Sequence, residues 1–106
     1  MLTALYIPVA SFPLPAHRDC DISHTGELFL LLKDRKTVSL YRPDAAAGFT
    51  LQWTRTAPAT TGGGEWDMIH AVGGGRCMLN GNLETVMMDE FGNEAGRWHD
   101  TGERSG

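Results

Sequence analysis

The sequence predicts an all-β chain made of two tandem four-stranded antiparallel units. Apolar residues recur along it with the two-residue period of strands, and turn-forming residues separate these runs. A second observation is an internal repeat, in which similar residues return in the same order after 45 to 48 positions. No window shows a sustained helical period with capping residues, so we expect almost no helix.

The expected strands follow one another along the whole chain. Residues 1–10 are apolar and predict a strand, after which Pro13 and Pro15 predict an extended connection. Residues 28–32 form a continuous apolar run, which is typical of a strand buried on both faces. Alternating apolar residues predict further strands at 38–40, 49–53, 68–72, 76–79 and 83–88, with a short one around Trp98.

Turn residues support the same division. Asn80-Gly81 is a strong signal for a short hairpin, because a type I′ turn needs two residues with positive φ. Lys33–Lys36 lies at the corresponding place in the first half. Residues 44–47, closed by Gly48, are the most helix-like stretch, but it is short enough to be a loop.

The repeat becomes explicit when the two halves are aligned. Asp21 aligns with Asp67, Leu32 with Leu79, Thr37-Val38 with Thr85-Val86, and Trp53 with Trp98. We therefore expect one domain over 1–106, since this length suits a single domain. Its parts are an N-terminal strand and Pro-rich connection (1–16), a first unit (17–56), a linker (57–64), a second unit (65–101) and a frayed tail (102–106).

Composition narrows the class of protein. With 13 acidic and 9 basic residues the chain is a small acidic protein of net charge −4, and its scattered basic residues argue against direct nucleic-acid binding. No apolar run is long enough to span a membrane, and no basic leader precedes the first one, so a cytoplasmic location is expected. Two cysteines, Cys20 and Cys77, are too few for a disulfide framework and are expected to be free thiols.

The second half resembles a β-propeller blade. It shows a strand that starts at Trp66, a glycine turn at 73–75, a hairpin at Asn80-Gly81, a strand that ends in Asp89 and a turn at Gly92-Asn93. A period of 40–50 residues with four strands per unit is the signature of such blades. The resemblance covers about residues 17 to 101 and identifies an architecture rather than one family.

The resemblance implies that two blades alone cannot close a ring, because about three repeats are normally needed for a stable stack. Either several chains assemble into a closed propeller, or the two units pack as a small sandwich or open barrel. Small fucose-binding lectins, which carry two blades per chain and trimerise, are similar in design. The sugar-site motifs of those lectins are missing here, so the likeness is one of architecture.

Catalytic and metal sites are not expected. His17, Cys20 and His24 have a spacing that zinc could use, but strong zinc signatures place ligand pairs at both ends. The serines lack a nucleophile-elbow context, and Asp19 and Asp21 disfavour a thiolate at Cys20. We therefore expect no enzyme activity, no metal and no cofactor.

Exposed aromatic and charged residues are the candidates for binding. Trp66 follows a glycine-rich linker and is expected to be a surface anchor. Trp53 and Trp98, like Asp21 and Asp67, are expected to be structural positions of the repeat. The expected binding residues are Trp66, Glu65, Tyr41, Arg55 and Arg97.

These observations predict a non-enzymatic binding protein, in which a rigid β scaffold engages another protein. An inhibitor, an immunity protein or an accessory factor, from a phage or a bacterium, would have this character. The alternative is a self-assembling two-blade propeller lectin that binds a small carbohydrate between blades. In either case the short chain, whose core is modest, is expected to form a homo-oligomer.

Overall fold

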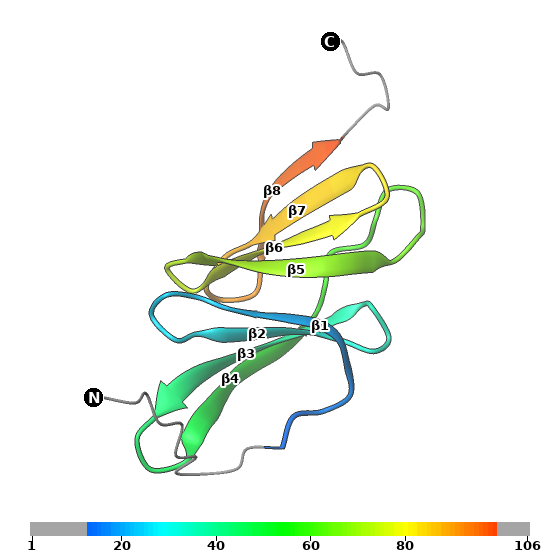
Figure 1. Ribbon diagram of the computed structural model, residues 1–106. Helices are drawn as coiled ribbons and strands as arrows, with labels where there is room; N and C mark the ends of the chain where they lie inside the picture. Colours follow the sequence, from blue (N-terminus) through cyan, green and yellow to red (C-terminus); the bar gives the residue numbers. More distant parts are fainter. Residues whose placement is uncertain (1–12, 100–106) are drawn as a thin grey trace, which may run out of the picture.

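A computed structural model describes residues 13–99 and confirms the predicted fold class. The described chain forms two four-stranded antiparallel sheets, contains no helix and does not close into a barrel (Figure 1). The strand expected over residues 1–10 and the tail expected over 102–106 lie outside the described residues, which exclude 1–12 and 100–106.

Consecutive strands pair in order within each sheet, so each sheet is a simple meander. Sheet 1 contains β1 (His17–Ile22), β2 (Leu28–Leu32), β3 (Thr37–Asp44) and β4 (Gly48–Thr56). Sheet 2 contains β5 (Trp66–Gly73), β6 (Arg76–Gly81), β7 (Glu84–Met88) and β8 (Glu94–His99). Residues 45–47 form the turn between β3 and β4, so the short stretch at 44–47 contains a loop rather than a helix.

One predicted turn lies two residues further along the chain. Asn80 and Gly81 belong to β6, and the hairpin turn consists of Asn82 and Leu83, with Leu83 at φ 61°. A leucine in this left-handed conformation is strained. Gly81 is needed in the strand instead, because a Cβ atom there would lie 3.0 Å from Cε3 of the Trp66 ring.

The main core lies between the two sheets. The continuous apolar run in β2 is buried on both faces, as predicted, because Phe29 and Leu31 point toward sheet 2 while Leu28 and Leu30 point the other way. Trp53 packs against this core from β4 and meets Phe29 edge-on, with ring centroids 6.4 Å apart. The buried members are Phe29, Leu31, Val38, Leu40, Ala57, Trp66, Ile69, Cys77, Leu79, Val86 and Met88.

The two sheets meet through unlike faces. In sheet 1 the Ser23 amide donates a hydrogen bond to the Glu27 carbonyl. Hydrogen-bonded and non-hydrogen-bonded residue pairs alternate along antiparallel strands, so Asp21 and Phe29 are also a hydrogen-bonded pair, and this pair faces the core. In sheet 2 the core-facing Ile69 turns its amide away from β6. If sheet 2 were superimposed on sheet 1, the outer side of sheet 2 would therefore coincide with the core side of sheet 1. Successive units of a stacked array pack in the same way, with opposite faces in contact.

This geometry changes the residue alignment of the repeat. The four-residue loop after β2 corresponds to the two-residue turn after β6, so Val38 matches Thr85 rather than Val86. When the strand registers of the two sheets are aligned in this way, Trp53 occupies the position of Gly96, and Asp21 the position of His70. Trp53 with Trp98, and Asp21 with Asp67, are thus not equivalent positions: Trp98 lies two residues after Gly96 on the same face, and Asp67 lies three residues before His70.

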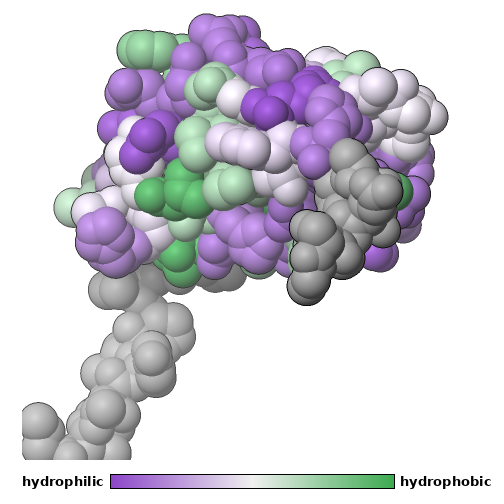
Figure 2. All heavy atoms as spheres, turned by 90° about the horizontal axis from the view of Figure 1, so that it is seen from above, coloured by the Kyte–Doolittle hydropathy of each residue, from purple (hydrophilic) through white to green (hydrophobic). Residues whose placement is uncertain are grey.

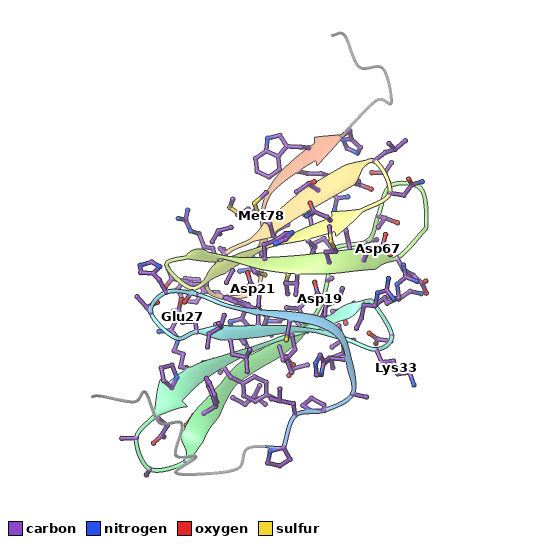
Figure 3. All side chains as sticks on the ribbon, viewed as in Figure 1. Asp19, Asp21, Glu27, Lys33, Asp67 and Met78 are labelled. Carbon is purple, nitrogen blue, oxygen red and sulfur yellow. The ribbon has the colours of Figure 1, made fainter. Side chains whose placement is uncertain are left out.

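Side chains of β1 hold the free edge of β5. Asp19 and Asp21 project from alternate positions of β1, and their carboxylates accept hydrogen bonds from the amides of Ile69 (2.9 Å) and Ala71 (2.8 Å). Figure 3 shows both aspartates between β1 and β5. Unpaired edge amides invite pairing with other chains, and here two carboxylates occupy them.

Two further contacts join the sheets at their ends. At one end, the buried Glu27 carboxylate accepts a hydrogen bond from the Gly75 amide at 3.0 Å and lies 3.6 Å from Arg42. At the other end, Arg35 in the turn after β2 donates to the Trp66 carbonyl at 3.0 Å and pairs with Asp67. The β1–β5 edge is therefore fixed along its whole length.

Replacing Gly81 by alanine should destabilise the protein by about 1–3 kcal/mol, because overpacking a tight contact forces neighbouring groups to move. The new Cβ would meet the Trp66 ring at 3.0 Å and the Glu65 carbonyl at 3.2 Å. Urea unfolding measures the effect. Gly62→Ala is the matched control, since a Cβ there meets nothing within 4 Å and φ is not positive. Equal midpoints for the two variants would contradict the close contact.

Candidate functional site

Trp66 is part of the core rather than a surface anchor. Only 2% of it is exposed, and its indole nitrogen donates a hydrogen bond to the Pro58 carbonyl at 2.9 Å. The expectation of a surface anchor was wrong, because the linker at 57–64 folds back over the ring and supplies the partner for its polar atom. A buried tryptophan needs such a partner.

The other expected binding residues are not brought together. Tyr41 is buried with Leu28 and Leu30 on the outer side of sheet 1. Glu65 lies 3.5 Å from Arg35 at the β1–β5 edge, where it supports the packing of the sheets. Arg55 donates to the Phe91 carbonyl at 3.3 Å and so ties β4 to the turn between β7 and β8.

Arg97 belongs to a charge cluster in sheet 2 whose one buried member is Glu84. Its guanidinium pairs with Glu84 and Glu94 and donates to the Ala59 carbonyl at 2.9 Å. Glu84 also accepts hydrogen bonds from the amide and hydroxyl of Thr61, both at 2.9 Å. The contacts of Thr61 and Ala59 attach the linker to β7 and β8, while the pair of Arg97 with Glu94 lies within β8.

The acid stability of the protein should depend on Glu84. Burial raises the pKa of its carboxyl group, but hydrogen bonds from Thr61 and Arg97 outweigh burial and hold the pKa below its usual 4.5. A lowered pKa stabilises the folded state above the unfolded-state pKa, and this stabilisation disappears as the pH falls through the folded-state pKa.

Urea unfolding between pH 7 and pH 3 tests this, with Glu84→Gln as the comparison. The wild type should be the more stable protein at neutral pH, and its advantage should shrink once the pH falls below about 4.5, the ordinary value for this group. Asp34 and Asp44 also have lowered pKa values, but they are unchanged in both proteins and cancel in the difference. A constant difference across this range would contradict the assignment.

Both sheets leave large apolar side chains exposed on their outer faces, Ile22 and Leu51 on sheet 1 and Met68 and Trp98 on sheet 2. Met68 is 47% exposed and Trp98 51% exposed, and the two stand on the same face. Two rows of directly paired residues cross it, Met68–Asn80–Thr85–Trp98 and His70–Met78–Met87–Gly96. We call these eight residues the sheet 2 outer face.

Trp98 lies across its own strand. A Cβ atom on Gly96 would be 3.1 Å from Cη2 of the Trp98 ring, so the indole extends over the glycine two residues earlier. The ring thus occupies the place that Trp53 holds on the core side of sheet 1. A half-exposed indole beside flexible methionine side chains is a combination enriched at protein interfaces.

Sequence reasoning did not identify this face, although a signal for it exists. The strand registers pair Met78 directly with Met87 and place Met68 in the neighbouring row of the same face, opposite Asn80. Figure 3 marks Met78 on β6, and Figure 2 shows from above that apolar side chains, in green, lie among polar ones at the surface. Only the pairing of strands shows which methionines share a face.

The hollows of the described surface are small or open. One of about 190 Å³ lies under the linker, where Trp66, Pro58 and Lys36 line it. A wider one of about 630 Å³ is bordered by Arg18, Lys33 and Arg35. Asp67 lies within 4 Å of both arginines, so the positive charge of this hollow is partly neutralised.

The two cysteines have different surroundings. Cys77 is buried in the core, and burial raises the pKa of its thiol to about 12. Cys20 is exposed on β1, and both thiols are free. In residues 13–99 no cluster of His, Cys, Asp or Glu side chains could hold a metal ion, and this part of the chain has no helix suited to crossing a membrane.

Comparison with known proteins adds no relative. No protein-family model matches the chain, and neither the curated proteins nor the solved structures that were searched contain a match.

Proposed function

We propose that the chain is a non-enzymatic binding protein that engages another protein through the sheet 2 outer face. The exposure of Met68 and Trp98 on one face of a regular sheet carries the proposal. Strand pairing fixes the backbone below these side chains, so little conformational freedom of the backbone is lost on binding. An inhibitor, an immunity protein or an accessory factor would use such a preformed surface.

The use of acidic side chains in the described chain also supports a binding role. Asp34, Asp44 and Asp89 accept hydrogen bonds from backbone amides of their own turns. Asp19 and Asp21 hold the edge of β5. Carboxylates used in this way stabilise the fold, and a general acid or base would need to face a cleft instead.

A carbohydrate site between the two sheets has less support. The space between them contains the core, with Phe29, Leu79 and Val86 fully buried. A sugar would need an open cleft with an aromatic platform, and the half-exposed Trp98 stands on the outer side of sheet 2. The lectin alternative would therefore place its site on the same outer face.

Photo-crosslinking tests the proposal. A benzophenone amino acid at Thr85, in the middle of the sheet 2 outer face, should form an adduct with another protein chain in cells of the source organism. The same group at Gln52, an exposed position of β4, is the control. Adducts from position 85 that disappear in Met78→Lys support the proposal, and no adduct from position 85 would overturn it.

A further inference from the structure

The sheet 2 outer face gathers three of the five methionines of the chain, Met68, Met78 and Met87, beside the imidazole of His70. The outer face of sheet 1 also leaves two apolar side chains about half exposed, but its two central rows contain no methionine and no histidine. What distinguishes the sheet 2 outer face is therefore the kind of atom that it presents, which is thioether sulfur together with imidazole nitrogen.

One row of directly paired residues carries three of these four side chains. His70 on β5 pairs with Met78 on β6, and Met78 pairs with Met87 on β7. Residues directly opposite one another on antiparallel strands have Cβ atoms about 4.5–5.5 Å apart. Methionine has three rotatable side-chain bonds, and both an imidazole and a thioether extend well beyond Cβ, so the three side chains can converge on one point above β6. Met68 stands two residues before His70 on the same face and supplies a further sulfur.

The Trp98 ring closes the same row at its other end. Gly96 pairs directly with Met87, and the indole extends over Gly96, since a Cβ atom there would lie 3.1 Å from Cη2 of the ring. The ring therefore fills the place beside Met87 that a fourth side chain of the row would occupy. The face of an indole attracts a cation through the quadrupole of the ring. The row thus presents an imidazole, two thioethers and an indole, in this order, across the four strands of the sheet.

These donors select a soft cation. Thioether sulfur suits Cu(I), and imidazole binds copper as well, whereas Mg²⁺ and Ca²⁺ take carboxylate and carbonyl oxygens. The eight residues of the sheet 2 outer face include no Asp, Glu, Lys or Arg. The face therefore offers no carboxylate to a hard cation and no positive charge that would repel a soft one.

The sequence prediction of no metal rested on the usual ligand patterns of Cys and His. In residues 13–99 no group of His, Cys, Asp and Glu side chains could hold a metal ion, and the thioethers of methionine lie outside that set of ligands. Strand pairing is what brings the methionines beside His70.

We propose that the sheet 2 outer face binds one Cu(I) ion, or Ag(I) in its place, through His70, Met78 and Met87, with Met68 as a further sulfur donor and the Trp98 ring beside the ion. The ion is bound and released without a change of oxidation state. This site goes beyond the proposed function, which uses the same face but requires no metal.

Titration of the purified full chain with Ag(I), followed by NMR of its methyl-labelled methionines, tests the proposal. The starting protein is Cys20→Ser, because the exposed Cys20 thiol would itself bind a soft ion. The methyl signals of Met68, Met78 and Met87 should shift until one ion is bound per chain. The signal of Met88, which is fully buried in the core, should not shift and serves as the internal control. Unchanged signals from the three outer methionines would overturn the proposal.

Replacement of both Met78 and Met87 by leucine in the Cys20→Ser protein removes two sulfurs and nearly conserves side-chain volume, so the fold should persist. The affinity for Cu(I), measured by competition with a coloured Cu(I) chelator, should fall by about tenfold or more, at least the usual cost of losing a group that supports a metal ligand. Met88→Leu makes the same chemical change in the core and should leave the affinity unchanged. Equal affinities of the double variant and the Met88→Leu control would overturn the site.

The benzophenone at Thr85 separates this proposal from the proposed function. The double leucine variant keeps the apolar surface, so position 85 should still form adducts with another protein after Cu(I) binding is lost. Adducts from a protein that shows no response to Ag(I) overturn the metal site and leave the proposed function standing. Ag(I) binding at the three methionines without any adduct supports the metal site and overturns the proposed function.

Discussion

Replacing Trp66 by alanine should destabilise the protein by about 3–5 kcal/mol, the cost of removing a large buried aromatic side chain. The ring is 2% exposed, packs in the core between the sheets and satisfies the Pro58 carbonyl with its indole nitrogen. A domain of this size is stable by only about 5–15 kcal/mol, so the variant would lose a large share of its stability. Urea unfolding followed by circular dichroism measures the loss.

Trp98→Ala is the matched control, because it removes the same side chain from a half-exposed position. Measured at a concentration where the chain is monomeric, it should change the free energy of unfolding by about 0.5 kcal/mol or less. Trp66→Phe keeps most of the buried ring and should cost less than Trp66→Ala, which provides a readout if the alanine variant does not fold. Similar losses for Trp66→Ala and Trp98→Ala would contradict the placement of Trp66 in the core.

The double replacement of Asp19 and Asp21 by alanine should cost about 3 kcal/mol, since each carboxylate accepts a hydrogen bond from a backbone amide and charged hydrogen bonds are the stronger ones. The amides of Ile69 and Ala71 would lose their partners at 2.9 and 2.8 Å. Urea unfolding gives the total effect, and hydrogen exchange gives the local one.

Hydrogen exchange of Ile69 and Ala71 distinguishes a local role from a general loss of stability. Their amides should exchange faster in the double variant by a larger factor than the amides that pair β6 with β7. Asp44→Ala serves as the control, because Asp44 holds the distant turn between β3 and β4. Replacement of both aspartates by asparagine, which keeps an oxygen acceptor, should restore part of the protection. Unchanged exchange at Ile69 and Ala71 would show that the carboxylates do not hold this edge.

Local patterns predicted the fold class, but not the relation between its halves. The apolar run of β2 correctly predicts a strand buried on both faces, and alternation finds the later strands, but β1 was not predicted because its sequence, HRDCDI, is mostly polar. Val38 and Val86 look equivalent in the sequence because each follows a threonine, and both are buried in the core. They do so from opposite faces of their sheets, and only the length of each hairpin loop decides this.

The candidate site was beyond sequence reasoning for a related reason. Trp66 follows a glycine-rich linker, which predicts exposure, but the carbonyl that receives its indole nitrogen comes from Pro58, eight residues earlier. The methionines of the sheet 2 outer face are far apart in the sequence, and only strand pairing brings them together on one face. Both features depend on contacts between segments, which periodicity within one segment cannot reveal.

The attachment of the β2–β3 turn to the start of β5 makes the two halves of the chain a single thermodynamic unit. Arg35 donates to the Trp66 carbonyl, and its own carbonyl accepts from the Trp66 amide. If the chain were cut in the linker, each fragment would expose an apolar sheet face, and the second would also expose the bare edge of β5. The two sheets should therefore unfold together in one cooperative transition, with neither surviving as a folded fragment.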